Sequence, residues 1–224
     1  MSEALSNLGV TLALCYGAWG FFHGFLHKRG VTFESGYVWT SSYFLGVAAV
    51  LAAIFWSSLG PVVSNYELTP LLVLTVVLCA VLLIQLQLPK YVQEPRNYFE
   101  VHPNRYYLKL GWRRFVSKTV EIAAQQVFIV VLVVLLRDLG LRLPELIIIF
   151  GMLFFFLHIP LLTIERGRWP MWAFLGAVIG FSIIFPYFIL YVPYGFAYNI
   201  AIHWLFYSFM AVTFWMWCAR SKHI

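Results

Sequence analysis

Apolar residues fill seven stretches of the chain, each bounded by charged residues, Pro or Gly. The stretches are Leu5–Leu26, Val38–Leu59, Leu68–Leu88, Ser117–Leu136, Pro144–Ile164, Trp169–Tyr191 and Gly195–Cys218. A helix that crosses a bilayer needs about 20 consecutive, mainly apolar residues. The pattern therefore predicts an all-α fold, a polytopic transmembrane helix bundle with about seven spans.

Composition agrees with this prediction. Of the 224 residues, 62% are apolar and only 11% are charged, whereas roughly a quarter of the residues of a soluble domain are charged. The spans leave no room for a separate soluble domain, so we expect a single integral membrane domain over residues 1–224. Its one long connection, residues 89–116, mixes aromatic with basic residues and is predicted to be an interfacial cytoplasmic loop.

The basic residues are distributed unevenly between the two sides of the predicted bundle. One side has only Arg137 and Arg142. The other collects the remaining 13, namely Lys28, Arg29, Lys90, Arg96, Arg105, Lys109, Arg113, Arg114, Lys118, Arg166, Arg168, Arg220 and Lys222. Because short basic loops stay in the cytoplasm, we expect the N-terminus outside and the C-terminus inside. Attraction to an anionic lipid leaflet explains the net charge of +6, and no nucleic acid is needed as a partner.

Among the ionisable residues inside predicted spans, Glu121, His158 and His203 stand out. Such residues normally face the interior of a bundle or a wet cavity, because at membrane depth each costs at least about 2.5–3.5 kcal/mol. Glu121 and His158 lie at similar depth near the cytoplasmic ends of their spans, so the two side chains can meet. We therefore expect these polar groups to converge on a cavity that opens to the cytoplasm.

Local spacing adds detail to two of these residues. His203 shares a helical stripe with Asn199 and Tyr207, because residues four apart lie on one face of a helix. Lys118, one turn before Glu121, is the only cation within local reach of that carboxyl. We expect Glu121 to be desolvated more strongly than it is compensated.

Three short motifs follow one another in the second half of the chain. They are Glu121-Ile-Ala-Ala-Gln-Gln126, Phe154-x-x-x-His158 and His203-x-x-x-Tyr207. In residue type and order they resemble the motifs of the CAAX-prenyl-protease-like (CPBP) family of glutamic intramembrane proteases. That family carries Glu-Glu-x-x-x-Arg, Phe-x-x-x-His and His-x-x-x-Asn on three separate membrane helices.

The chain departs from the family pattern at three positions. Ile122 stands in place of the second Glu, Gln126 in place of the Arg, and Tyr207 in place of the final Asn. The resemblance covers roughly residues 121 to 207. It fits best a divergent branch similar to the sorting-type (myxosortase-like) members, which cut C-terminal membrane anchors from other proteins.

The resemblance implies an endopeptidase that hydrolyses a membrane-anchored protein without a cofactor or metal, in a bacterial or archaeal cytoplasmic membrane. Glu121 would be the general base that activates water, and His158 would bind and orient that water. His203, with Tyr207, would donate hydrogen bonds to the oxyanion. Gln126 would offer neutral hydrogen bonds where the family has a cation.

Other readings of the same residues stay open. His158 and His203, with or without Glu121, are residue types that bind haem or a divalent cation. A transporter or an assembly partner would use them for a proton or for contacts between helices. Glu121 alternatively forms a structural pair with Lys118.

Overall fold

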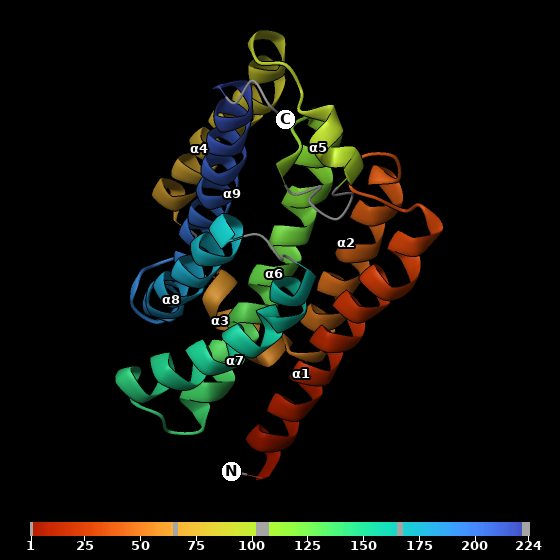
Figure 1. Ribbon diagram of the computed structural model, residues 1–224. Coiled ribbons are helices and arrows are strands. Elements are labelled where there is room, and N and C mark those ends of the chain that lie inside the picture. The colour runs from red at the N-terminus through yellow and green to blue at the C-terminus, as the bar shows by residue number, and fades with distance from the viewer. Residues whose placement is uncertain (1, 65–66, 102–107, 165–167, 221–224) are drawn as a thin grey trace.

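A computed structural model describes residues 2–64, 67–101, 108–164 and 168–220, and this part of the chain is all α-helical (Figure 1). The α-helices are α1 (Ser2–Phe21), α2 (Tyr37–Ile54), α3 (Trp56–Ser64), α4 (Leu68–Tyr91), α5 (Arg96–Val101), α6 (Trp112–Asp138), α7 (Leu143–Ile164), α8 (Arg168–Tyr191) and α9 (Gly195–Arg220). A π-helical turn, Phe22–Leu26, and a 3-10 turn, His27–Arg29, extend α1. The predicted all-α class is confirmed.

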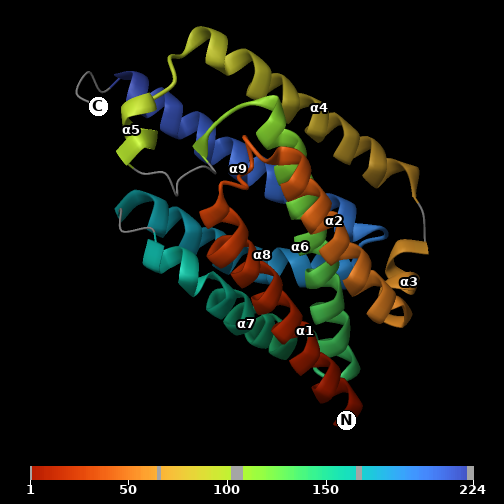
Figure 2. The same cartoon turned by 90° about the vertical axis from the view of Figure 1, so that its right-hand side faces the viewer.

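Five described helical segments are long and apolar enough to cross a membrane. They are Glu3–Arg29, Tyr37–Ile54, Leu68–Tyr91, Trp112–Asp138 and Gly195–Arg220. Two shorter apolar segments, Leu143–Ile159 and Leu175–Tyr191, belong to α7 and α8. The start of α1 and the end of α9 lie at opposite ends of the molecule in both views (Figures 1 and 2).

Two predicted boundaries are wrong. The second predicted span is broken at Phe55, whose backbone (φ −110°, ψ 28°) leaves the helical region between α2 and α3. α6 begins at Trp112 and not at Ser117, because the apolar pattern excluded a first turn that contains Arg113 and Arg114. Basic residues can lie in the first turn of a helix, but a search for apolar runs leaves such a turn out.

The predicted loop over residues 89–116 is divided in the structure. Its beginning, residues 89–91, belongs to α4, its middle contains α5, and its end, residues 112–116, belongs to α6. Residues 102–107 lie outside the described part of the chain, as do three of the basic residues counted for orientation, Arg105, Arg166 and Lys222.

α6 is the central helix of the bundle. It packs against α1, α2, α3, α4, α7, α8 and α9. In its most apolar stretch 72% of the residues are buried inside the protein, against 11% in α4. Large apolar side chains of the outer helices point away from the core, as expected for surfaces in lipid; Trp39 is 73% exposed and Phe209 66%.

A tight turn joins α8 to α9. Tyr194 adopts a positive φ of 54°, and the next residue, Gly195, has no room for a side chain. A Cβ atom at Gly195 would lie 1.9 Å from the carbonyl oxygen of Phe188. Further along α9 the Asn199 Nδ2 donates a hydrogen bond of 3.3 Å to the carbonyl oxygen of Phe185 on α8. These contacts set the position of α9, which carries His203.

Candidate functional site

A buried ion pair lies on the central helix. The Nζ atom of Lys118 is 2.6 Å from Oε2 of Glu121, and both side chains are about 5% exposed or less. The other carboxylate oxygen, Oε1, accepts hydrogen bonds from Gln125 Nε2 at 3.1 Å and from Trp19 Nε1 at 3.4 Å. The expectation of a poorly compensated carboxyl is therefore wrong, because Lys118 turns inward to pair with Glu121 and two further side chains donate hydrogen bonds to it.

The Lys118 ammonium also meets aromatic rings. Its Nζ lies 4.1 Å from the centre of the Tyr207 ring on α9 and 5.5 Å from the centre of the Phe33 ring. A cation within about 6 Å of a ring centre is attracted by the ring's negative face. Lys118 is thus turned into the bundle, and we call its surroundings the Lys118 cluster: Trp19, Lys118, Glu121, Gln125, Gln126, His158, His203 and Tyr207.

His203 and Tyr207 form the α9 side of the Lys118 cluster. Their rings are stacked, with centres 5.2 Å apart and planes 14° apart. Gln126 Nε2 lies 3.4 Å from His203 Nδ1. With Gln126 Nε2 as the donor, Nδ1 accepts this bond, which requires the His203 tautomer that carries its proton on Nε2. Within the described part of the chain, the buried Oε1 of Gln126 has no hydrogen-bond partner.

His158 forms the α7 side, with the opposite proton placement. Its Nδ1 donates a hydrogen bond of 2.7 Å to the carbonyl oxygen of Phe154, one turn earlier. A carbonyl oxygen can only accept, so the proton sits on Nδ1, and Nε2 of the neutral ring has a lone pair. His158 therefore offers an acceptor at Nε2, whereas His203 offers a donor at its own Nε2.

Electrostatic interactions link four helical segments at this place. The charge of Lys118 acts on His158, on His203 and on His23 in the turn that follows α1. Direct contacts join Lys118 to Glu121 and Tyr207, and Gln126 to His203. His158 lies within electrostatic range of Lys118 and His203, and its hydrogen bond to Phe154 is within its own helix.

Other polar residues of the spans are not members of the Lys118 cluster. Gln85 Oε1 accepts a hydrogen bond of 3.0 Å from the backbone N–H of Gly111 and so joins α4 to the start of α6. The rings of His23 and His27 have centres 6.3 Å apart. Among the described residues, no group of three or more His, Cys, Asp or Glu could hold a metal ion.

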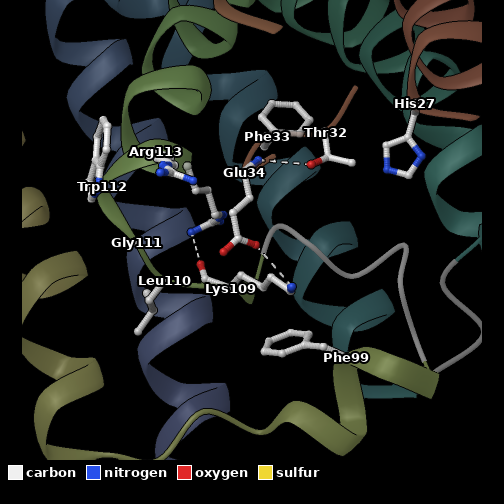
Figure 3. A pocket seen from close by; sticks show the side chains of 11 residues that line it. His27, Thr32, Phe33, Glu34, Phe99, Lys109, Leu110, Gly111, Trp112 and Arg113 are labelled. Atoms are coloured by element: carbon white, nitrogen blue, oxygen red, sulfur yellow. Dashed lines mark hydrogen bonds and ion pairs between the residues drawn. The ribbon is translucent and has the colours of Figure 1, made fainter. Parts of the chain in front are cut away.

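A pocket of about 380 Å³ lies at the basic end of the bundle (Figure 3). It is lined by His27, Thr32, Phe33, Glu34, Phe99, Lys109, Leu110, Gly111, Trp112, Arg113 and Arg114. None of the five predicted site residues lines it. Phe33 is shared, because it lines the pocket and also faces the Lys118 ammonium. The pocket is therefore next to the Lys118 cluster and not within it.

Sequence reasoning gave Lys118 only as an alternative structural partner of Glu121, on its spacing of three residues, and missed Trp19. Trp19 gave no signal, because its contact with Glu121 joins residues that are 102 positions apart.

Comparison of the chain with protein-family models, with curated proteins and with solved structures finds no match. The described fold and the Lys118 cluster define the class as an all-α protein with several candidate membrane spans and a polar centre.

Proposed function

We propose that the chain is a seven-span membrane protein with its N-terminus outside and its C-terminus inside. Besides the five long apolar segments, α7 and α8 supply the other two spans. They have 22 and 24 residues, and at about 1.5 Å per residue each covers the roughly 30 Å of a hydrocarbon core. The basic first turn of α6 and the basic last turns of α4 and α9 mark the cytoplasmic end.

We further propose that the Lys118 cluster is the active site of an intramembrane endopeptidase that cuts a membrane-anchored protein. The observation that carries this proposal is a buried, ion-paired carboxylate on α6 with His203 on the adjacent α9, together with a His158 whose Nδ1 proton is donated to Phe154. Hydrolysis by an activated water needs a base, an acceptor that orients the water, and a donor for the oxyanion. Glu121, His158 Nε2 and His203 Nε2 supply these three groups.

The reaction would begin when Glu121 takes a proton from a water molecule held by His158 Nε2. The water oxygen forms a bond to the peptide carbonyl carbon, and the resulting oxyanion accepts a hydrogen bond from His203 Nε2. Glu121 then passes the proton to the leaving nitrogen as the peptide bond breaks. Lys118 keeps Glu121 ionised where Gln126 replaces the cation expected from the family pattern.

A specific observation favours a second candidate. Both oxygens of Glu121 already accept hydrogen bonds, from Lys118, Gln125 and Trp19. A carboxylate satisfied in this way also suits a structural pair that holds α1 and α6 together in a non-proteolytic transporter or assembly partner.

Proteolysis is tested with the purified protein in liposomes together with membrane proteins extracted from the expression host. Mass spectrometry identifies peptide termini that form with the wild type, in the presence of serine and cysteine reagents. Glu121→Gln and His158→Ala should abolish these termini, while Glu67→Gln, an exposed glutamate outside the cluster, should leave them unchanged. His203→Ala should retain about 10⁻² to 10⁻³ of the rate, the usual loss for one oxyanion donor.

Two outcomes separate the candidates. Full turnover by both Glu121→Gln and His158→Ala contradicts the proteolytic site. A wild type that produces no termini favours the structural candidate. Tyr207→Phe adds a finer test. Unchanged turnover in this variant would show that the tyrosine hydroxyl does not bind the oxyanion, and the role proposed for His203 would still stand.

The topology is tested separately with reporter fusions. A reporter after Ile224 should be cytoplasmic, and one near Glu67, just before α4, should be outside. A C-terminal reporter found outside contradicts the seven-span arrangement.

A further inference from the structure

The pocket at the basic end has a charge imbalance. Three of its lining residues, Lys109, Arg113 and Arg114, are cationic, against one anionic residue, Glu34. Its volume of about 380 Å³ is within the range of about 300–1,000 Å³ of small-molecule sites. Arg114 is only 3% exposed. A cation held in such a poorly hydrated position interacts more strongly with an anion than one on an open surface.

The chain around the pocket holds these charges in place. Gly111 has a φ of +151°, which favours glycine, and its N–H is bound by Gln85. This turn directs Arg113 and Arg114 into the first turn of α6, where Arg114 donates a hydrogen bond to the carbonyl oxygen of Lys109. Arg114 is therefore held in place at the cationic side of the pocket.

The anionic side is held more loosely. Thr32 Oγ1 accepts hydrogen bonds from the backbone N–H groups of Glu34 and Ser35 in a tight turn. Glu34 pairs with Lys109 at 3.3 Å, with side-chain exposures of 57% and 32% (Figure 3). An exposed pair of this kind is worth only about 0–1 kcal/mol. A stronger anion can therefore take over Lys109 from Glu34.

We propose that this pocket binds a phosphate group, carried either by the headgroup of an anionic lipid or by a soluble phosphate ester. Guanidinium groups match the geometry of phosphate oxygens, and Lys109 adds a third positive charge. Trp112, which lines the pocket, contacts the ring of Tyr37, and aromatic residues of this kind are common at the level of lipid headgroups. This site is independent of the proposed proteolysis, because Phe33 separates it from the Lys118 cluster.

The test measures lipid binding to the full-length protein in detergent by native mass spectrometry. The probes are phosphatidylglycerol, zwitterionic phosphatidylcholine, whose choline cation offsets the charge of its phosphate, and inorganic phosphate as a competitor. The wild type should bind phosphatidylglycerol at least tenfold more tightly than phosphatidylcholine. Displacement of phosphatidylglycerol by inorganic phosphate shows that the phosphate group is what the pocket binds. Inorganic phosphate that binds as tightly as the lipid assigns the pocket to a soluble phosphate ester, and much tighter binding of the lipid assigns it to the lipid headgroup.

The variant Lys109→Gln/Arg113→Gln should lose most of this preference, about tenfold or more in affinity for two charge-assisted hydrogen bonds. Its matched control is Lys90→Gln/Arg220→Gln, which removes the same charge from the ends of α4 and α9, outside the pocket lining. The control should keep its affinity within about twofold, since both side chains are exposed, lie outside the lining and are screened by salt.

Glu34→Gln is expected to change the affinity for phosphatidylglycerol in the opposite direction. Removal of the only anionic side chain in the described lining should tighten phosphatidylglycerol binding several-fold, an effect that misfolding cannot imitate. The proposal is overturned if the wild type shows no preference for phosphatidylglycerol, or if the control variant loses as much affinity as the pocket variant.

Discussion

Two lysine–glutamate pairs lie close to one another in different surroundings. Lys118–Glu121 is buried within the bundle, with an N–O distance of 2.6 Å and exposures of 5% and 4%. Lys109–Glu34 lies in the pocket at the basic end, with a distance of 3.3 Å and exposures of 32% and 57%. Phe33 stands between the two pairs.

The same two residue types therefore have different consequences. In the pocket, water competes for both partners, so the pair can open to admit an anion. In the bundle, neither partner can turn to water, so each is needed to compensate the other. Burial, and not the identity of the residues, distinguishes the pair that is closed to water from the pair that is open to it.

The largest effect is expected when one member of the buried pair is removed. Lys118→Met should lower the free energy of unfolding by about 3–5 kcal/mol, because Glu121 is left buried without its cation. Equilibrium unfolding in mixed micelles measures this change. If Lys118→Met were as stable as the wild type, other groups would stabilise the Glu121 carboxylate without Lys118. The buried pair would then be no more important for stability than the exposed pair.

Removing both charges of the buried pair should lower the free energy of unfolding much less than removing Lys118 alone. In Lys118→Met/Glu121→Gln no ion is left unpaired, and the new amide oxygen can still accept from Trp19 or Gln125. We expect a coupling energy of about 2–3 kcal/mol between the two substitutions in a double-mutant cycle. Additive losses would mean that the two side chains do not compensate one another.

A neutral contact at the same depth separates the effect of charge from that of burial. Gln126→Leu removes the hydrogen bond to His203 Nδ1 and should cost about 1 kcal/mol. Gln87→Leu, an exposed residue of α4, is the matched control and should change the unfolding free energy very little. A loss in Gln126→Leu as large as that in Lys118→Met would show that burial alone, without charge, explains the site.

The smallest effect is expected in the exposed pair. Lys109→Met should change the unfolding free energy by less than about 1 kcal/mol, and added salt should reduce even this difference. The loss in Lys118→Met should persist at high salt, because buried pairs are poorly screened. Unfolding curves at low and high salt for both variants measure this contrast.

The extent to which sequence predicts this structure differs between helices and contacts. The all-α class could be predicted because apolar runs as long as Leu68–Leu88 suit a membrane-spanning helix. The break at Phe55 and the early start of α6 could not, since an apolar run reports neither backbone dihedrals nor helical turns rich in arginine. Helical spacing placed His203 and Tyr207 on one face, and their rings are stacked.

In the candidate site, too, local sequence predicted some features and could not predict others. Glu121 stood out because a carboxyl inside an apolar run is costly. Its contact with Trp19 could not be foreseen, because it depends on how α1 packs against α6. The pocket at the basic end likewise joins Glu34 to Lys109 across 75 positions, and local spacing carries no information on such contacts.

The most direct test is the turnover of Lys118→Met/Glu121→Gln, measured on a preparation whose folding is verified by unfolding in mixed micelles. This variant should keep its fold but lack the base, so it separates catalysis from structure. We predict that it produces none of the new peptide termini that the wild type forms from membrane proteins. Turnover at the wild-type rate by this folded variant would contradict the assignment of the Lys118 cluster as the catalytic site.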